Sequence, residues 1–310
     1  MSNKTYRDSH LYSVYFAPRG TVRMLNLGMM LAQQHLSPLD RLIGVIGDPG
    51  SGKSILVKGM FPGLELSNDD QGVNVRPLPV LNIDEHSFYS SHTYHLDVRF
   101  EMGFTNIGVL ADAVRRAIEM GKRVIVEHFD LLYPTLGMNA ELLIGVGEEV
   151  IITRPTIFGP EPQDIYEIVS KSQPYRKMAH TAENLTERFL AQYGGWKYAH
   201  GDVRHGFLLE FDEKPEVDLA VLEGQVKECI DQDISISLYD ETHILIGEDI
   251  IHPCTGPRIH VRSTGEIKNF TLLHDFLYDP ISRHYMLIGL VGDSAEDRET
   301  RLNDLNKITL

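Results

Sequence analysis

Cysteine is scarce in this chain, and long apolar runs are absent from it. Of 310 residues only Cys229 and Cys254 are cysteines, which argues against a disulfide framework and suits a reducing compartment. No run of about 18 apolar residues occurs, so we expect no membrane-spanning helix. Residues 1–8 lack the apolar core of a signal peptide. We therefore expect a cytoplasmic protein with no membrane partner.

Positive charge is also in short supply. The chain has 29 Lys and Arg against 44 Asp and Glu, a net charge of −15, and neither half is basic. Nonspecific binding to nucleic acid needs a basic surface, so a tRNA partner would need a local patch and is not favoured. The 42% hydrophobic and 24% charged composition is that of an ordinary globular protein, long enough for two domains.

What the chain does contain is a complete phosphate-binding motif, G-x-x-x-x-G-K-S. Its residues are Gly47, Asp48, Pro49, Gly50, Ser51, Gly52, Lys53 and Ser54. An aliphatic segment over 41–46 precedes it, and residues 55–60 can begin a helix. This order aims backbone N–H groups at phosphates, with Lys53 at the β- and γ-phosphates and the Ser54 hydroxyl on Mg²⁺. We predict a nucleoside triphosphate with Mg²⁺; no motif distinguishes ATP from GTP.

Two acidic residues follow predicted strands near this motif. A strand region over 73–83 leads to Asp84, and a strand over 123–127 ends at Glu127. On the ligand side of an open sheet, Asp84 could orient an acceptor hydroxyl or a Mg²⁺-bound water, or it could cap the next element. We expect Glu127 to assist Mg²⁺. Four histidines of this half are interpreted as solvated or capping rather than metal-binding: His86, His92, His95 and His128.

The remaining pattern of the first half predicts an α/β domain over residues 1–155 with an N-terminal arm. We expect a parallel sheet of four or five strands flanked by helices. Helices are expected over 21–34 and 106–121, strands over 142–146 and 149–153, and an edge strand or arm over 10–20.

Residues 40–155 resemble the uridine kinase and phosphoribulokinase family. The resemblance rests on the phosphate-binding motif and two later segments, Ile83-Asp84-Glu85-His86-Ser87-Phe88-Tyr89 and Val124-Ile125-Val126-Glu127-His128. It implies a P-loop fold, ATP as phosphoryl donor, and Asp84 as the base that activates the acceptor. The chain departs from the family in having a short segment between 89 and 105 and no Arg-rich lid after residue 154.

A Pro/Gly-rich connector is predicted over 156–177, followed by an α+β domain over 178–310. The pattern predicts a short helix over 165–170, a helix over 178–190, strands over 206–211, 234–238 and 243–246, and a helix over 217–231. His180 lies on the second of these helices, while Cys254 and His260 follow the last strand. Cysteine and histidine are zinc ligands, but this spacing alone is a weak signal.

Residues 178–292 resemble the second additional domain of alanyl- and threonyl-tRNA synthetases and of free-standing alanyl-tRNA editing proteins. The matching segments are His180-Thr181-Ala182-Glu183-Asn184 and Cys254 to His260-Val261-Arg262-Ser263-Thr264-Gly265-Glu266-Ile267. The resemblance implies a Zn²⁺ site at His180, Cys254 and His260 that hydrolyses mischarged aminoacyl-tRNA. Here Asn184 replaces the family's second His, and an amide is a poor zinc ligand. His252 could substitute, or the residues could pack in a metal-free domain.

Three functional hypotheses follow from the sequence. The first is an ATP- and Mg²⁺-dependent phosphotransferase acting on a small hydroxyl-bearing acceptor, with Lys53, Asp84 and Glu127 as its catalytic residues. The second is a zinc-dependent aminoacyl-tRNA hydrolase regulated by nucleotide. The third is a non-catalytic nucleotide switch.

Overall fold

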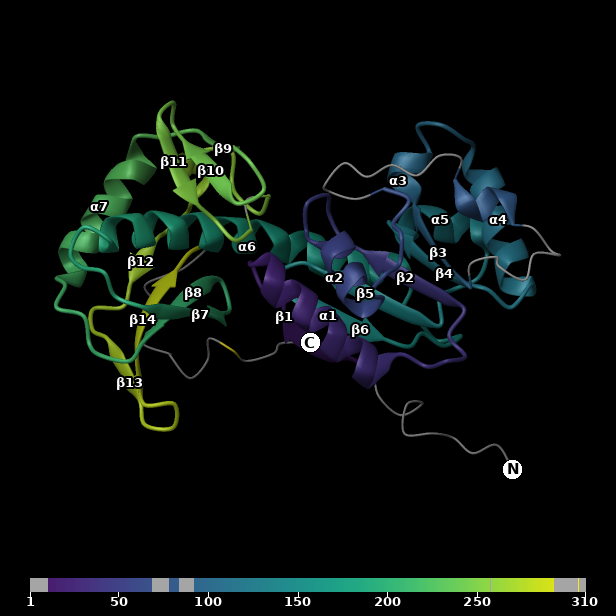
Figure 1. The fold of residues 1–310 in the computed structure, drawn as a ribbon, viewed down its shortest axis with the longest axis horizontal. Helices are drawn as coiled ribbons and strands as arrows, with labels where there is room; N and C mark the ends of the chain where they lie inside the picture. Colours follow the sequence, from purple (N-terminus) through teal and green to yellow (C-terminus); the bar gives the residue numbers. More distant parts are fainter. Residues whose placement is uncertain (1–10, 69–77, 84–91, 257, 293–305, 307–310) are drawn as a thin grey trace. The chain divides into compact units, whose positions relative to one another are not determined.

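The computed structural model describes residues 11–68, 78–83, 92–256, 258–292 and 306 (Figure 1). The chain divides into two compact units: residues 1–17 with 21–171, and residues 18–20 with 172–310. The division falls inside helix α6 (Pro162–Leu190). Most of the segment predicted as a connector is therefore helical, and only residues 156–161 of it precede α6. The short segment Pro18–Gly20 belongs to the second unit, although its chain neighbours on both sides belong to the first.

Unit 1 contains a six-stranded, mostly parallel sheet in the order β1-β6-β5-β2-β4-β3. Its parallel core consists of β2 (Leu42–Ile46), β3 (Thr93–Asp97), β4 (Arg123–Glu127) and β5 (Leu142–Val146). In this core, β2 lies between β4 and β5. The carboxyl ends of β2 and β4 are therefore neighbours, and the residues that follow them share one edge of the sheet.

One strand of this sheet, β6, runs antiparallel to the others, where the sequence pattern predicted a parallel sheet. β6 (Glu149–Thr153) turns back on β5 after two residues, and β1 (Ser13–Phe16) pairs with β6 as the edge strand. A parallel neighbour needs a crossover of a dozen or more residues, so a two-residue connection permits only a hairpin. The expectation of an edge strand near the N-terminus is confirmed.

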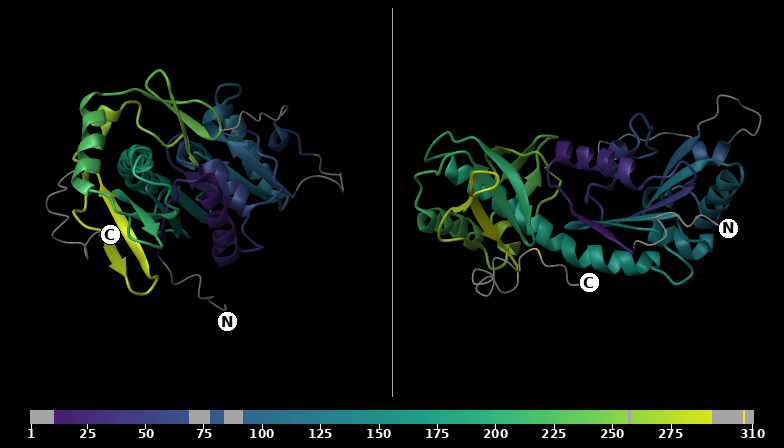
Figure 2. Two further views of the ribbon diagram at one scale, coloured as in Figure 1. Left: turned by 60° about the vertical axis from the view of Figure 1, so that its left-hand side comes forward. Right: turned by 90° about the horizontal axis from the view of Figure 1, so that it is seen from below.

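Helices cover both faces of this sheet. α1 (Thr21–His35) and α2 (Lys53–Met60) pack on one face, and α4 (Ile107–Glu119), α5 (Phe129–Leu136) and the start of α6 pack on the other. Figure 2 shows α1 and α6 on opposite sides of the strands. Alternate residues of β2 enter the two cores, which is why this strand is aliphatic at nearly every position.

One predicted strand does not form as expected. Of the region 73–83, residues 78–83 are described, and Pro79–Asn82 is a short 3₁₀ helix, η2, with proline in its first turn. Proline fixes φ and has no N–H to give to a ladder, so this segment cannot continue a central strand. The strand that pairs with β4 is β3 instead, and a one-turn helix, α3 (Val98–Glu101), follows it.

Unit 2 is built from helices and antiparallel sheets. One sheet joins β7 (Tyr198–Val203), β8 (Gly206–Phe211), β12 (Thr271–Leu272), β13 (Leu277–Asp279) and β14 (His284–Leu290). The other joins β9 (Ile236–Leu238), β10 (His243–Ile246) and β11 (Ile250–Pro253). A core formed by both sheets, α6 and α7 (Leu219–Asp231) holds the unit together.

The chain as a whole is α/β, with a mostly parallel sheet followed by antiparallel sheets. In the part that the structure describes, no helix combines the length and apolar character needed to cross a membrane.

Candidate functional sites

The glycine-rich loop of unit 1 connects β2 to α2 and begins at the carboxyl edge of the sheet. Its backbone requires glycine at two positions in particular. Gly47 has φ +147° and a Cβ there would lie 2.4 Å from the Val146 carbonyl oxygen, while Gly52 has φ +92° directly before α2. The motif glycines are thus needed for the path of the chain into the helix.

Lys53 and Ser54 form the first turn of α2, and both side chains are buried. The Lys53 ammonium donates hydrogen bonds to the carbonyl oxygens of Gly47 (3.0 Å) and Asp48 (2.9 Å). The lysine therefore folds back over the first residues of the loop, where a point charge would meet a phosphate bound by the loop.

Glu127 ends β4 beside this loop, as the sequence predicted for its position on the sheet. The Ser54 hydroxyl helps to lower the pKa of its carboxylate, which indicates that the two side chains lie close together. Burial alone would raise the pKa of Glu127, but His95, Lys53 and Ser54 together hold it below its usual value. Glu127 is therefore an anion next to the Ser54 hydroxyl, and a carboxylate with a hydroxyl is the type of oxygen pair that binds Mg²⁺.

His95, which was expected to be solvated or capping, is instead buried in β3 beside Glu127. Its Nδ1 accepts a hydrogen bond from the Ser67 backbone N–H (3.1 Å), so the ring proton resides on Nε2. That Nε2 donates to Glu127 Oε1 at 3.1 Å. His95 thus fixes one oxygen of Glu127, and only the buried setting of β3 could have revealed this.

The predicted base, Asp84, lies outside the described residues. At the carboxyl end of the strand beside β4 the structure places Asp97, whose oxygens accept from the Phe100 N–H and the Asn68 amide at 3.0 Å each. Asp97 caps α3 in this way. It therefore acts as a structural acid rather than a free base.

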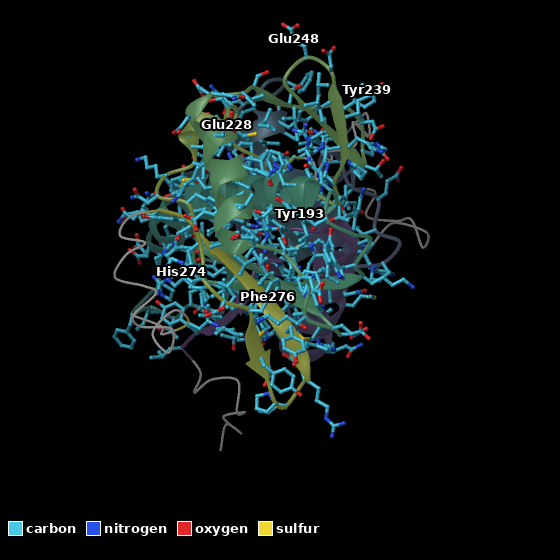
Figure 3. All side chains as sticks on the ribbon, turned by 90° about the vertical axis from the view of Figure 1, so that its left-hand side faces the viewer. Tyr193, Glu228, Tyr239, Glu248, His274 and Phe276 are labelled. Atoms are coloured by element: carbon cyan, nitrogen blue, oxygen red, sulfur yellow. The ribbon has the colours of Figure 1, made fainter. Side chains whose placement is uncertain are left out.

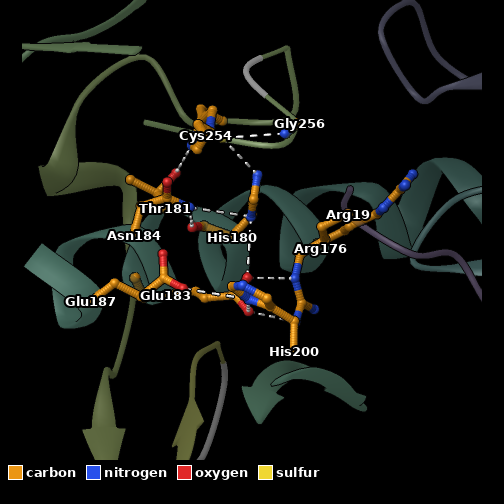
Figure 4. A network of polar contacts seen from close by, with 12 residues as sticks. Arg19, Arg176, His180, Thr181, Glu183, Asn184, Glu187, His200, Cys254 and Gly256 are labelled. Carbon is orange, nitrogen blue, oxygen red and sulfur yellow. Dashed lines mark hydrogen bonds and ion pairs between the residues drawn. The ribbon is translucent and has the colours of Figure 1, made fainter. Parts of the chain in front are cut away.

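Unit 2 brings His180, Cys254 and His260 together, although 74 residues separate His180 from Cys254. His180 lies on α6, Cys254 follows β11, and His260 precedes the 3₁₀ helix η3 (Thr264–Glu266). Cys254 Sγ lies 3.3 Å from Nε2 of His180 and 3.3 Å from Nε2 of His260 (Figure 4). The two imidazole rings stack with centroids 4.4 Å apart.

Hydrogen bonds on the far side of each ring turn both Nε2 atoms toward the thiol. His180 Nδ1 is 3.2 Å from Glu183 Oε2, so it donates to that carboxylate. Thr181 uses its one hydroxyl hydrogen on the Lys177 carbonyl, and its oxygen therefore accepts from His260 Nδ1 at 3.2 Å. Both Nε2 atoms then carry free lone pairs, which is how outer carboxylate and hydroxyl groups orient metal-binding histidines.

This buried trio fits a metal ion such as zinc. In a tetrahedral site, Zn–S and Zn–N bonds of ordinary length place S and N about 3.6 Å apart, close to the two 3.3 Å separations here. Burial lowers the pKa of both histidines, which keeps them neutral, and raises the pKa of the Cys254 thiol to about 12. A metal would therefore displace the thiol proton on binding.

The two further residues considered as ligands behave differently. Asn184 donates its amide to the His180 carbonyl at 2.8 Å, and its Oδ1 is buried without a hydrogen-bond partner among the described residues. His252 Nε2 is likewise buried and unpartnered there. Neither joins the group of three whose ligand atoms lie within 4.8 Å of one another. Among the described residues three side chains could thus act as ligands, which is the number typical of zinc sites with one open position.

Glu183 organises the surroundings of this trio and was not identified from the sequence. Arg19 forms a buried ion pair with it at 2.9 Å, and His200 Nδ1 lies 3.1 Å from its other oxygen. Burial by itself would raise the pKa of Glu183, but the Arg19 charge and the two histidines hold it well below the usual value. The sequence signal was present, since Glu183 lies within the segment that carries the resemblance.

Comparisons with known proteins give no family. No family model matches the chain, and no curated protein matches it. The chain is weakly similar to an aminotransferase from Eubacterium rectale (11% identity, 69% of this chain and 64% of that one, TM-score 0.24). It is also weakly similar to the cysteine desulfurase CsdA from Escherichia coli (11% identity, 94% of this chain and 77% of that one, TM-score 0.24). These values support no conclusion about fold or activity.

Proposed function

We propose that this protein is an ATP- and Mg²⁺-dependent phosphotransferase that acts on a small hydroxyl-bearing acceptor. The observation that carries the proposal is the arrangement of Lys53, Ser54 and Glu127 around a glycine-rich loop at the carboxyl edge of β2 and β4. In this proposal unit 1 is a P-loop NTPase domain of the kind that the resemblance to uridine kinases implies.

In this proposal each residue of the site has its own role in phosphoryl transfer. The loop from Gly47 to Ser54 binds the phosphates of ATP, and Lys53 offsets charge on the transferring phosphoryl group. Ser54 and Glu127 hold Mg²⁺, with His95 fixing the orientation of Glu127. Asp84, predicted to activate the acceptor, keeps that role as an expectation from the resemblance.

Nucleotide binding followed by label transfer tests the proposal. Wild-type protein should bind Mg·ATP and pass label from γ-labelled ATP to a small molecule, whereas Lys53→Ala should lose binding with its fold intact. Lys58→Ala is a matched control, because it removes a lysine of the same helix outside the motif. An equal rate of ATP turnover in wild type and Lys53→Ala would contradict the proposal. Tight Mg·ATP binding without turnover would favour the nucleotide switch.

A second function is favoured by the His180, Cys254 and His260 group of unit 2. The trio supports a zinc site, and the resemblance to the second additional domain suggests hydrolysis of a mischarged aminoacyl-tRNA. Zinc would supply a Lewis acid and a bound water there. Acidic side chains such as Glu228 and Glu248 are exposed on this unit (Figure 3), which does not favour a tRNA partner.

Metal analysis tests this second function. We expect about one zinc per chain in protein purified without chelator, and loss of zinc in Cys254→Ala. The matched control is Cys229→Ala, since that thiol is also buried but does not belong to the group of three ligand atoms. Zinc retained by Cys254→Ala would contradict the assignment. Deacylation of mischarged tRNA by wild type, abolished in Cys254→Ala, would establish the hydrolase.

A further inference from the structure

Unit 1 contains a cavity of about 280 Å³ beside the glycine-rich loop, and none of the residues discussed above as catalytic lines it. Its walls come from the loop, the segment after β3, the segment after β4, and α6. The lining residues are Gly47, Asp48, Pro49, Arg99, Met102, His128, Asp130, Leu131 and Tyr166.

The position of the cavity marks it as the space next to the terminal phosphate. Gly47 and Asp48, which line it, are the two residues whose carbonyl oxygens contact the Lys53 ammonium. Since the lysine of such a loop reaches the β- and γ-phosphates, the cavity lies at the end of the loop from which a phosphoryl group would leave.

The volume limits what this cavity can hold. At about 280 Å³ it is slightly smaller than the range of about 300–1,000 Å³ that is typical of ligand pockets. A compact molecule of the size of a small sugar or hydroxy acid fits this space.

One wall of the cavity offers a positive charge. Arg99 is exposed, and within the described residues no hydrogen bond or ion pair engages its guanidinium. His128 lines the same cavity, but burial and the charge of Lys53 lower its pKa to about 4, so it is neutral at pH 7. Arg99 is therefore the cation of the lining available to an anionic ligand.

Another residue of the lining, Asp130, offers a hydrogen-bond acceptor that the described part of the protein does not use. Asp130 Oδ1 is shielded from solvent and has no hydrogen-bond partner among the described residues. Such an atom is costly to leave unpaired, and a rotation of the Asp130 carboxyl group, which lines the cavity, would let a ligand hydroxyl satisfy it. Next to it, His128 has a left-handed backbone at φ +56° and ψ +44°, a conformation that non-glycine residues adopt mainly where surrounding structure imposes it.

We propose that this cavity binds the phosphoryl acceptor, and that the acceptor is a compact hydroxylated anion whose charge pairs with Arg99 and whose hydroxyl donates to Asp130. The inference rests on the proposed phosphotransferase function and names its substrate class. It gives Arg99 and Asp130 separate parts: Arg99 selects for charge, and Asp130 selects for a hydroxyl group.

Ligand-detected NMR with matched probes tests the two parts separately. The probes are glycerate and glycerol 3-phosphate as hydroxylated anions, glycerol as the uncharged analogue, and propionate as the anion without a hydroxyl. Wild type should bind at least one hydroxylated anion about tenfold more tightly than glycerol or propionate. Glycerate and glycerol 3-phosphate distinguish a carboxylate from a phosphate as the recognised group.

The variants assign each preference to its residue. Arg99→Gln should abolish the advantage of the anions over glycerol, and Asp130→Asn should reduce the advantage of glycerate over propionate. Arg262→Gln and Asp112→Asn, exposed residues that do not line the cavity, are charge-matched controls and should change neither preference. Hydroxylated anions that bind no more tightly than glycerol, or a preference that survives Arg99→Gln, would overturn the inference.

Because these measurements need no nucleotide, their outcome is separable from the proposed function. A wild-type protein that binds no Mg·ATP but shows the Arg99-dependent preference would remove the phosphotransferase and retain the anion site. A wild-type protein that binds Mg·ATP but shows no such preference would remove the anion site and retain the phosphotransferase proposal.

Discussion

A single imidazole, that of His95, determines the state of the acid at the end of β4. Its Nδ1 is occupied by the Ser67 N–H, so its Nε2 has a hydrogen to donate to Glu127. The carboxylate is buried and stays ionised through this bond together with Lys53 and Ser54. The metal-binding capacity proposed for Glu127 therefore depends on a residue one strand away.

Replacing His95 with leucine should expose that dependence. His95→Leu leaves a buried carboxylate without its donor, and we expect a loss of about 3 kcal/mol in the free energy of unfolding. Chemical denaturation measures it, and Mg·ATP affinity should fall as well. His92→Leu, the same change at an exposed position, should stay within about 0.5 kcal/mol of wild type. Equal stability of the two variants would contradict the described network.

The ionisation of Glu187 should make the stability of unit 2 depend on pH. Burial and the adjacent Glu183 charge raise its pKa from 4.5 to about 7, against the opposing influence of His200 and Tyr198. Between these values the folded state holds a proton that the unfolded state has released, so this group makes the protein less stable as pH rises through that window. Glu187→Gln should remove the loss, and its stability relative to wild type should rise by up to about 3 kcal/mol from pH 4 to pH 8.

Thermal or urea unfolding at several pH values checks this. Glu167→Gln, an exposed glutamate on the same helix, should show a difference from wild type that does not vary with pH. A pH-independent effect of Glu187→Gln would mean that Glu187 ionises normally.

At the scale of elements, α1 and α2 touch backbone to backbone. A Cβ on Gly59 would lie 2.3 Å from the Leu25 carbonyl oxygen, and one on Gly28 would lie 2.4 Å from that of Leu56. Because α2 begins with Lys53, this contact also sets the position of the lysine that is proposed to bind phosphate.

Gly59→Ala should force the two helices apart, with a loss of about 2–3 kcal/mol in unfolding free energy and weaker Mg·ATP binding. Gly224→Ala is the matched control, since that helical glycine has open space around its Cβ position. There alanine should stabilise by about 0.5–1 kcal/mol through its higher helix propensity. A neutral Gly59→Ala would contradict the close packing of α1 on α2.

The sequence predicted most elements of unit 1 but not all of its topology. Periodicity located α1, α4 and the strands β2, β4, β5 and β6, because each has a regular apolar pattern. The antiparallel turn at β6 was readable from its two-residue connection but was missed. β3 was missed because Thr93–Asp97 is short and contains a polar His95, whose partner becomes evident only in three dimensions.

The bounds of helix α6 were also predicted incorrectly from the sequence. Two separate helices were predicted, over 165–170 and 178–190, where one helix of 29 residues forms. Pro174 lies within it at an exposed position, and proline in a sequence indicates a helix boundary more often than a helix interior. Of the candidate sites, the loop and the His180, Cys254 and His260 group were predicted from motifs, whereas His95, Glu183 and the Arg99 cavity depend on contacts that no local pattern encodes.

At the scale of the whole molecule, Arg19 connects a distant part of the chain to unit 2. It lies between β1 and α1 in sequence, yet it pairs with Glu183 and donates to the carbonyl oxygens of Gly201 and Gly206. Both members of the ion pair are nearly inaccessible to solvent, at 5% and 2% side-chain exposure. Breaking such a pair leaves an uncompensated buried charge.

We therefore expect Arg19→Met to destabilise unit 2 selectively, by about 3–5 kcal/mol. Hydrogen exchange should show lost protection in β7 and β8, with β2 and β4 of unit 1 unchanged. Arg262→Met, at an exposed site, should leave all four strands protected. Protection lost equally from both units would show that Arg19 serves the whole chain rather than unit 2.

The ion pair between Arg19 and Glu183 also bears on how the chain is made. Glu183 lies 164 positions after Arg19 in the chain, so Arg19 is synthesised well before its partner. Strands β2 to β6 are completed in that interval, so unit 1 can begin to fold while the guanidinium is still without its carboxylate. The contact between Arg19 and Glu183 is therefore one of high sequence separation, the kind that slows folding.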